Sequence, residues 1–429
     1  MNSLLLRHRD FRLLWIGETT SKFGSSVTTV VLPLIAVTTL QASTLAIGLL
    51  GATVWLPWLL IGLPAGAWVD RLPHRPIMLI SAALSAVLLA VVPAAAAAGL
   101  LSLQLLFMIA FLTGIAAVFF QTAYTAYLPN LVTASDRAEG NAKLQGSASA
   151  AQIAGLGCGG LAVQLFGAVN GLVIDALTFV ASFACIAAIH YRETRQPAPP
   201  EQSLVRDVAQ GIQLVGADVW LRTLIVFGAT SNLALMGYQS IIVVFLIREV
   251  GVGASTVGGL IAGASAGGVL GAFAARRVAD RIGTARATLF FELVLPAAAL
   301  LIPLTTRGYG VLLYLTGGFC VGAGVVAGNV IKSTFQQEYC APEFRGRLAA
   351  TGSFVNLGTI PLGSALGGVL GTAFDLRTAL WISTVGVPLA GLILIFSPIR
   401  RVRDLPLDGQ AQGCGVPGVA ESSRRVRTD

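Results

Sequence analysis

Charged residues are scarce in this sequence. Aspartate, glutamate, lysine and arginine together make up 11% of the 429 residues, whereas hydrophobic residues make up 55%. A soluble domain carries about 25% charged residues, and a water-soluble chain of this length could not hide so much apolar surface. The low charge therefore excludes an ordinary soluble protein and indicates a chain whose solvent is lipid.

Residues suited to catalysis or metal binding are also few. The three histidines, His8, His74 and His190, are scattered along the chain, and the five cysteines show no metal or redox spacing. No nucleophile elbow or phosphate loop is present, because the glycine-rich strings lie inside apolar segments. The sequence therefore predicts no enzyme, no cofactor, no metal site and no nucleotide-driven pump.

The N-terminus lacks the pattern of a cleavable signal peptide. Arg7, Arg9, Asp10 and Arg12 follow a very short apolar run, whereas a signal peptide needs an apolar stretch of about 7–15 residues. We expect the first membrane span to act as the insertion signal.

Long apolar blocks are abundant. A spanning helix needs about 20 apolar residues, and twelve blocks approach or exceed this length. They cover residues 13–40, 44–69, 77–98, 101–128, 144–168, 169–190, 223–247, 254–275, 287–306, 309–331, 348–373 and 378–398. The sequence therefore predicts an all-α membrane protein with twelve transmembrane helices.

Lysine and arginine are distributed unevenly between the segments that connect these blocks. If the N-terminus is cytoplasmic, the outer loops hold only Arg248, Arg307 and Arg377. Apart from Lys22, which lies inside the first block, the inner segments hold the rest, and Lys332 is assigned to the segment after the tenth span. This is the positive-inside bias of membrane proteins. It predicts that both termini are cytoplasmic in a multi-pass protein of a bacterial cell membrane, and it explains the net charge of +8 without a nucleic-acid partner.

The longest inner loop divides the twelve spans into two sets of six. It opens with a proline-rich stretch at 195–200, which no helix tolerates. Apolar residues then recur at helical spacing over 204–215, which predicts a short helix on the membrane surface. The resulting divisions are a six-helix bundle at 1–190, a cytoplasmic linker at 191–222, a second six-helix bundle at 223–398 and a disordered tail at 399–429.

The two halves repeat one another. Asp70-Arg71 follows the second span and Asp280-Arg281 follows the eighth, 210 residues later. Gly140 and Gly346, after the fourth and tenth spans, are 206 residues apart. Such offsets indicate a duplicated six-helix unit, a plan in which the substrate site lies between the halves near mid-membrane.

The loop after the second span carries a recognisable motif. Gly66-Ala-Trp-Val-Asp70-Arg71, followed by Arg75, matches the Gly-x-x-x-Asp-Arg signature of the major facilitator superfamily, which the whole chain resembles. This resemblance implies the major facilitator fold and transport by alternating access. It also implies that Asp70, Arg71 and Arg75, with the second copy at Asp280 and Arg281, latch the cytoplasmic side. The alternative is that these residues are ordinary solvated charges.

Within the superfamily, the chain resembles the drug:proton antiporter branch that includes macrolide-efflux and enterobactin-export proteins. The matching pieces are Phe11–Gly17, Leu128–Val132, Asp175–Phe179 and Gly346-Arg347. The chain departs from the pattern in three places. Pro73 and His74 replace a glycine and a basic residue, the fourth span lacks an arginine, and the glycine-rich 155–160 lacks a proline.

Four ionisable residues lie inside the apolar blocks: Glu18, Lys22, Asp175 and Glu292. Charges inside a membrane are costly, and they mark functional or paired groups. Glu18 and Lys22 have the spacing of a helical ion pair, which serves either structure or a proton or cation site. Asp175 serves either transport or helix–helix hydrogen bonding, and Glu292 serves either transport or structure at the cytoplasmic edge.

Glycines recur at four-residue spacing in two spans. Small residues at this spacing let helix backbones approach closely. Helix packing is therefore the expected role, and the alternative is that these faces slide during transport. The residues are Gly259, Gly263, Gly267 and Gly271 in the eighth span, and Gly363 and Gly367 in the eleventh.

These features together predict a secondary active transporter. We expect a monomer that exports small amphipathic compounds, such as drugs, antibiotics, siderophores or secondary metabolites, in exchange for protons. Two alternatives remain at this point. One is a nutrient or metabolite importer of the same fold, and the other is a membrane sensor or scaffold that transports nothing.

Overall fold

The computed structural model describes residues 4–69, 71–132, 136–191, 212–213, 215–340 and 342–406. Within these ranges the chain forms helices, turns and connecting loops, and no strand is present. Most of the surface helix predicted at 204–215 and most of the tail predicted as disordered lie outside the described residues.

Twelve helical segments of the described chain are long and apolar enough to cross a membrane. Those of the first half, after a short α1 (Leu4–Arg7), are α2 (Arg9–Leu34, continued by the π-helical η1, Ile35–Thr39), α3 (Thr44–Val69), α4 (His74–Ala97), α5 (Leu103–Leu131), α6 (Arg137–Phe166) and α7 (Ala168–Ala187). Each coincides with a predicted span.

The second half repeats this pattern with one irregular span. Its segments are α9 (Val219–Phe245, continued by η2, Leu246–Val250), α10 (Ala254–Ile282), a ninth span made of α11 (Thr284–Leu289), η3 (Phe290–Val294) and η4 (Pro296–Leu304), then η5 (Gly308–Gly310), α12 (Val311–Tyr339), α13 (Pro342–Ala373), α14 (Leu376–Ile395) and η6 (Pro398–Arg401). The predicted all-α fold of twelve spans in two sets of six is confirmed.

Local chemistry fixes the ends of several helices. The carboxylate of Asp218 accepts hydrogen bonds from the backbone N–H groups of Trp220 and Leu221 and so caps α9. Asp375 caps α14 in the same way. Gly167 joins α6 to α7 at a φ of 82°, a left-handed conformation that glycine adopts without strain. Side-chain caps and one glycine turn therefore set where these spans begin and end.

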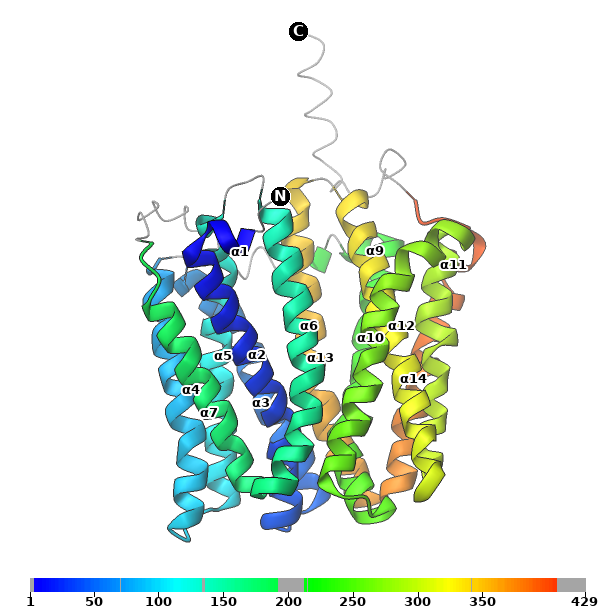
Figure 1. Cartoon of the computed structure of the whole chain (residues 1–429). Coiled ribbons are helices and arrows are strands. Elements are labelled where there is room, and N and C mark those ends of the chain that lie inside the picture. The colour runs from blue at the N-terminus through cyan, green and yellow to red at the C-terminus, as the bar shows by residue number, and fades with distance from the viewer. Residues whose placement is uncertain are drawn as a thin grey trace.

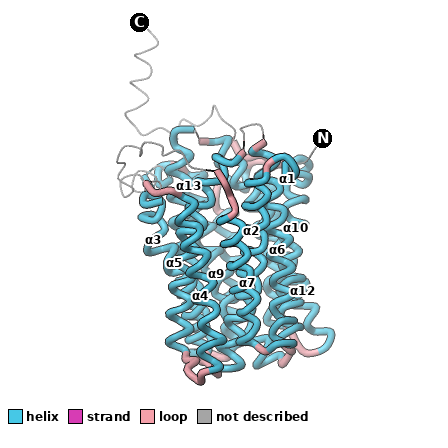
Figure 2. Tube along the Cα trace, turned by 60° about the vertical axis from the view of Figure 1, so that its left-hand side comes forward, coloured by secondary structure: helices cyan, strands magenta, loops and turns pink. Residues whose placement is uncertain are grey.

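The helices stand side by side in two bundles, with the first half in blue to green and the second in green to red (Figure 1). They run along the long axis of the molecule, and the loops gather at its two ends (Figure 2). We call the end where α2 begins and α7 ends the basic end. The opposite end, where α3 begins and α6 ends, is the distal end.

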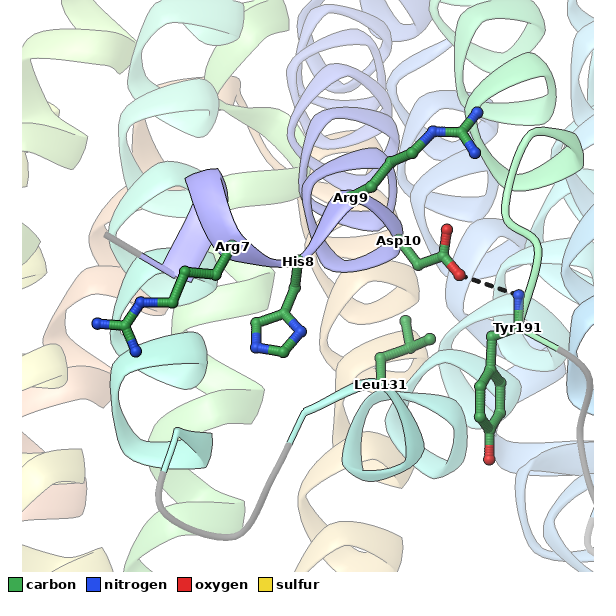
Figure 3. Close-up of a pocket in the computed structure, with 6 residues that line it drawn as sticks. All are labelled: Arg7, His8, Arg9, Asp10, Leu131 and Tyr191. Carbon is green, nitrogen blue, oxygen red and sulfur yellow. Dashed lines mark hydrogen bonds between the residues drawn. The ribbon is translucent and has the colours of Figure 1, made fainter. Parts of the chain in front are cut away.

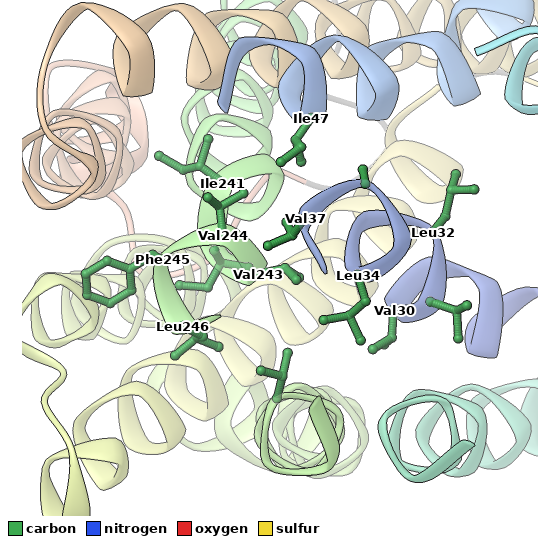
Figure 4. Close-up of a cluster of buried hydrophobic side chains, with 14 of the residues drawn as sticks. Val30, Leu32, Leu34, Val37, Ile47, Ile241, Val243, Val244, Phe245 and Leu246 are labelled. Atoms are coloured by element: carbon green, nitrogen blue, oxygen red, sulfur yellow. The ribbon is translucent and has the colours of Figure 1, made fainter. Parts of the chain in front are cut away.

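The buried apolar side chains show how the bundles meet. One cluster, at the distal end, draws on both bundles: Val37 and Ile47 belong to it together with Ile241 and Val244 (Figure 4). Two further clusters lie toward the basic end, and each contains residues of one bundle alone. Among the described residues, the bundles therefore share one core at the distal end and keep separate cores at the basic end.

Two glycine pairs bring the bundles into backbone contact at the distal end. A methyl group built on Gly258 of α10 would lie 2.7 Å from the Cα of Gly160 in α6. One built on Gly368 of α13 would lie 3.0 Å from the Cα of Gly48 in α3. No side chain larger than hydrogen fits at these distances, so the two pairs form a tight seal.

The glycines singled out from the sequence lie within the second bundle instead. Gly263, Gly267 and Gly271 of α10 lie against α12. Gly363 and Gly367 of α13 lie against α9, whereas Gly259 faces open space. The glycines at four-residue spacing thus pack helices within one bundle. The two bundles are joined by different glycines, the Gly160–Gly258 and Gly48–Gly368 pairs.

Candidate functional site

Glu18 and Lys22 form a polar site inside the first span. Glu18 is 5% exposed, and its Oε1 lies 3.6 Å from the Nζ of Lys22. Lys22 also donates a 3.1 Å hydrogen bond to Oε1 of Gln121 on α5. The second oxygen of Glu18 is buried and has no hydrogen-bond partner in the described structure. The site therefore holds a carboxylate with an unused acceptor beside the ammonium of Lys22.

The Lys22 side chain opens onto a polar face of α2. It is 44% exposed, and the exposed Ser25 and Thr29 follow it at helical spacing. A cation exposed to lipid would be costly, so this face lies along water. α6 and α7 cover the remaining sides of α2, since Gly155 packs on Phe23 and Gly24 packs on Thr178. The polar face therefore points toward the space between the bundles.

Asp175 of α7 is a different kind of site. It is 1% exposed, and its carboxyl group accepts hydrogen bonds from Thr28 of α2 at 2.5 Å and from Thr178 at 3.0 Å. Gly24 provides the room for this group, because its lack of a side chain leaves space for the carboxyl oxygen and the Thr178 hydroxyl. Asp175 thus ties α2 to α7, and no ion-pair partner reaches it among the described residues.

Glu292 forms a second intramembrane ion pair, in the other bundle. Its Oε1 lies 2.6 Å from the Nζ of Lys332, and the two side chains are 3% and 15% exposed. The same Nζ lies 5.0 Å from the centre of the Phe227 ring. Three different spans, η3, α12 and α9, supply these three groups.

Lys332 was assigned from the sequence to the loop after the tenth span, and that assignment is wrong. α12 continues to Tyr339 and so carries Lys332 inside the span. The sequence holds a signal for this extension, because the polar residues Asn329, Ser333 and Gln337 continue the helical spacing past the apolar block. An apolarity criterion ends such a helix too early, because part of its surface faces water.

The ninth span is irregular around Glu292. The helix changes from α to π at Phe290–Val294 and then to a 3₁₀ helix from Pro296 onward. Proline lacks a backbone N–H, so it cannot continue the α-helical bonding. Single π turns in helices occur frequently at functional sites, and here the turn carries the acidic residue of the pair.

The residues predicted to form a latch lie near the basic end. Asp70 lies outside the described residues, and Arg71 lies in the turn after α3. The guanidinium of Arg75 donates hydrogen bonds to the carbonyls of Ile186 and Ala187 at the end of α7, within the same bundle. In the second half, Asp280 lies 3.9 Å from Arg276 on an exposed face of α10, and Arg281 follows it in the last turn. Arg75 and Asp280 thus bond to groups of their own bundles.

A shallow cavity of about 290 Å³ lies at the basic end (Figure 3). Asp10 ties its wall together, because its carboxylate accepts hydrogen bonds from the backbone N–H groups of Tyr191 at 2.9 Å and His190 at 3.4 Å. The cavity is lined by Arg7, His8, Arg9, Asp10, Leu131 and Tyr191. Neither Asp175 nor any member of the two ion pairs lines it, so the cavity is separate from both pairs.

No group of three or more histidine, cysteine, aspartate or glutamate side chains is placed to hold a metal in the described structure. The ionisable groups inside the spans are instead two carboxylate–ammonium pairs, one in each bundle, and the hydrogen-bonded carboxyl group of Asp175. By helix rise, Glu18, Glu292 and Lys332 all lie about 10–15 Å inside the basic end. The arrangement suits binding of a proton or a small polar group at one depth.

Residues 4–421 match the family model described as transmembrane secretion effector, MFS_3. The chain belongs to this family. The transmembrane secretion effectors are part of the major facilitator superfamily, whose members are transporters and not enzymes. The predicted superfamily and the predicted absence of a catalytic role therefore agree with the match.

Known transmembrane transporters resemble this family member along most of its length. The multidrug efflux pump Tap of Mycolicibacterium fortuitum is 25% identical over 406 residues, covering 92% of this chain and 97% of Tap. The Tap of Mycobacterium tuberculosis strain H37Rv is 28% identical over 369 residues, covering 83% and 86%. A bacterial homologue of the iron transporter ferroportin, solved in an inward-facing state, aligns with a TM-score of 0.72 at 17% identity, covering 92% and 99%. This last likeness shows the fold alone.

Proposed function

We propose that this transporter exports small amphipathic compounds, drugs among them, in exchange for protons. The observation that carries the proposal is the similarity to multidrug efflux pumps over more than four fifths of the chain. A carboxylate–ammonium pair inside each bundle supports it, because charges at this depth are retained where ions or substrates pass.

The orientation follows from the distribution of arginine and lysine. The positive-inside bias favours a cytoplasmic basic end, and thus cytoplasmic termini, in the cell membrane of a bacterium. We propose that the conformation, with a shared core at the distal end and separate cores at the basic end, is the one that admits substrate from the cytoplasm. Substrate enters from the cytoplasm in this state and leaves after the bundles rock to the opposite state.

Glu18 and Lys22 are the proposed proton-coupling site. The unpaired oxygen of Glu18 is available to a proton, and protonation removes the charge that holds Lys22 nearby. Lys22 then turns fully to Gln121 and the water-filled face of α2. A proton and a substrate thus alternate at one site, which is the requirement for exchange.

Asp70, Arg71 and Arg75, with Asp280 and Arg281, are the proposed latch of the basic end in the outward-open state. In this structure Arg75 holds the end of α7, and Asp280 pairs on its own helix. Closing the basic end would bring these loops within reach of the other bundle. A single chain supplies both bundles, so we propose that a monomer is the working unit.

A drug-susceptibility panel tests the proposal. The protein is expressed in an efflux-deficient bacterial host, alone and as Glu18→Gln and Asp70→Asn variants, with Glu338→Gln as a control that removes an exposed carboxylate of α12. We expect resistance from the parent and the control, and loss of resistance from the other two. In everted vesicles, an uncoupler should stop drug uptake; uptake that persists would rule out proton coupling.

A further inference from the structure

The ammonium of Lys332 occupies a small cation-binding site formed by Glu292 and Phe227, which we call the receptor. The ammonium lies 2.6 Å from the Glu292 carboxylate and 5.0 Å from the centre of the Phe227 ring. A carboxylate and an aromatic face on one ammonium form the combination that binds alkylammonium ligands in general, through a charge-assisted hydrogen bond and a cation–π contact. The lysine thus takes the position that a free amine would take.

The two groups of the receptor are buried, whereas its occupant is a long side chain. Glu292 is 3% exposed and Phe227 is 1% exposed. Gly328 of α12 makes room for the carboxylate, since a methyl group built on it would lie 2.7 Å from Cγ of Glu292. Lysine, by contrast, carries its charge on a four-carbon chain with several rotatable bonds. The ammonium can leave the receptor while the receptor keeps its shape.

The polar face of α12 provides a way out for Lys332 and a way in for a ligand. Asn329, Ser333 and Gln337 are exposed along this face, and Lys332 lies next to Ser333 and three positions from Asn329. Gln337 donates a 3.3 Å hydrogen bond to Ser333, so the face is organised as a polar surface. An exposed polar stripe inside a span lies along water.

Stability is a weak reason for the pair. A buried ion pair contributes little to stability compared with apolar residues of the same shape, although removing one partner leaves a costly bare charge. A cationic ligand that replaces the Lys332 ammonium keeps Glu292 neutralised throughout. A neutral ligand gains nothing from the exchange, because it would leave the carboxylate unpaired.

We infer that Glu292 and Phe227 form a subsite for organic amines, and that Lys332 is its tethered occupant and thereby a specificity-determining residue. This inference rests on the proposed function, since it names a substrate class for the same transporter. Lys332 lowers the affinity for amines by competing for Glu292. It leaves the affinity for neutral compounds unchanged.

Binding of a matched pair of fluorescent probes tests the inference. The probes are dansylcadaverine, which carries a primary ammonium, and its N-acetyl derivative, which is neutral. Both are titrated against the purified full-length protein in lipid nanodiscs. We expect Lys332→Met to tighten dansylcadaverine binding about tenfold, the factor expected for one charge-assisted hydrogen bond, and to leave the acetylated probe unaffected.

Further variants separate the receptor from general effects. Glu292→Gln added to Lys332→Met should abolish the tightening, and Phe227→Leu should weaken the amine probe alone. Lys143→Met, which removes a surface lysine paired with Glu139, is the matched control and should change neither probe. If Lys332→Met proves unstable, Phe227→Leu alone decides: equal effects on both probes, or none, would overturn the inference.

The outcome is distinguishable from failure of the proposed function. If the parent protein confers resistance in cells but Lys332→Met does not separate the two probes, the amine subsite is wrong and export stands. If the parent confers no resistance and binds neither probe, the proposed export function itself is wrong.

Discussion

Nη2 of Arg248 donates a 2.7 Å hydrogen bond to the backbone carbonyl of Ala42, across 206 residues of sequence. Arg248 belongs to η2 of the second bundle, and Ala42 lies between η1 and α3 of the first. This bond lies at the distal end, where the Gly160–Gly258 and Gly48–Gly368 contacts also join the bundles. The distal end is therefore held by backbone contact and by a charge-assisted bond.

Gly258→Val should open the distal seal. Its side chain would collide with the backbone of Gly160, and overpacking of this kind costs about 1–3 kcal/mol. The conformation closed at the distal end should lose population in consequence. We expect a cysteine placed at the buried Ala42, in a cysteine-free background, to react about tenfold faster with a membrane-impermeant maleimide.

The neighbouring glycine provides the control for this experiment. Gly259 faces open space, so Gly259→Val should leave the maleimide rate unchanged. Equal rates in the two variants would mean that the glycine contact does not set the conformational equilibrium.

Arg248→Ala should loosen the same end to a smaller extent. A hydrogen bond to a charged donor contributes about 1.5–3 kcal/mol when buried, and less where water competes. The maleimide rate at position 42 should rise about threefold. Arg307→Ala serves for comparison, because Arg307 binds the carbonyl of Val250 within its own bundle. It should lower thermal stability without changing the rate at position 42.

Asp175→Asn should preserve both folding and transport. Asparagine offers an acceptor to Thr28 and keeps the link between α2 and α7, whereas Asp175→Ala leaves the buried hydroxyl groups without this partner. The alanine variant should lose about 1–3 kcal/mol of stability, measured by thermal unfolding in detergent. Loss of transport by a stably folded Asp175→Asn variant would show that the carboxyl group itself takes part.

Glu18→Gln should abolish transport and leave stability almost unchanged. The carboxylate has an unpaired oxygen, and its partner Lys22 lies 3.6 Å away and also bonds to Gln121, so its removal disturbs few bonds. We expect a change in melting temperature of a few degrees at most and loss of proton-driven drug uptake in everted vesicles. Uptake at the parental rate with an undiminished response to an imposed pH gradient would assign coupling to another residue.

Much of the architecture was predictable because it depends on local composition. A stretch of about 20 apolar residues forms a spanning helix wherever it occurs, so all twelve spans were identified from the sequence. Glu18, Asp175 and Glu292 stood out for the same reason, as isolated acids in apolar blocks. Lys332 was missed because its helix is partly polar, and a criterion based on apolarity cannot distinguish a water-facing helix from a loop.

The sequence by itself determined that this protein is a membrane protein, how many spans it has and that they form two sets of six. These properties follow from the frequency and order of apolar residues. The tertiary structure decided which residues contact one another. It placed Glu292 against Lys332 and Phe227, and Gly258 against Gly160, by packing spans that are distant in the chain. Contacts of this kind depend on which helix faces meet, and in lipid that choice is made by shape and small residues, since apolar surface alone favours no neighbour.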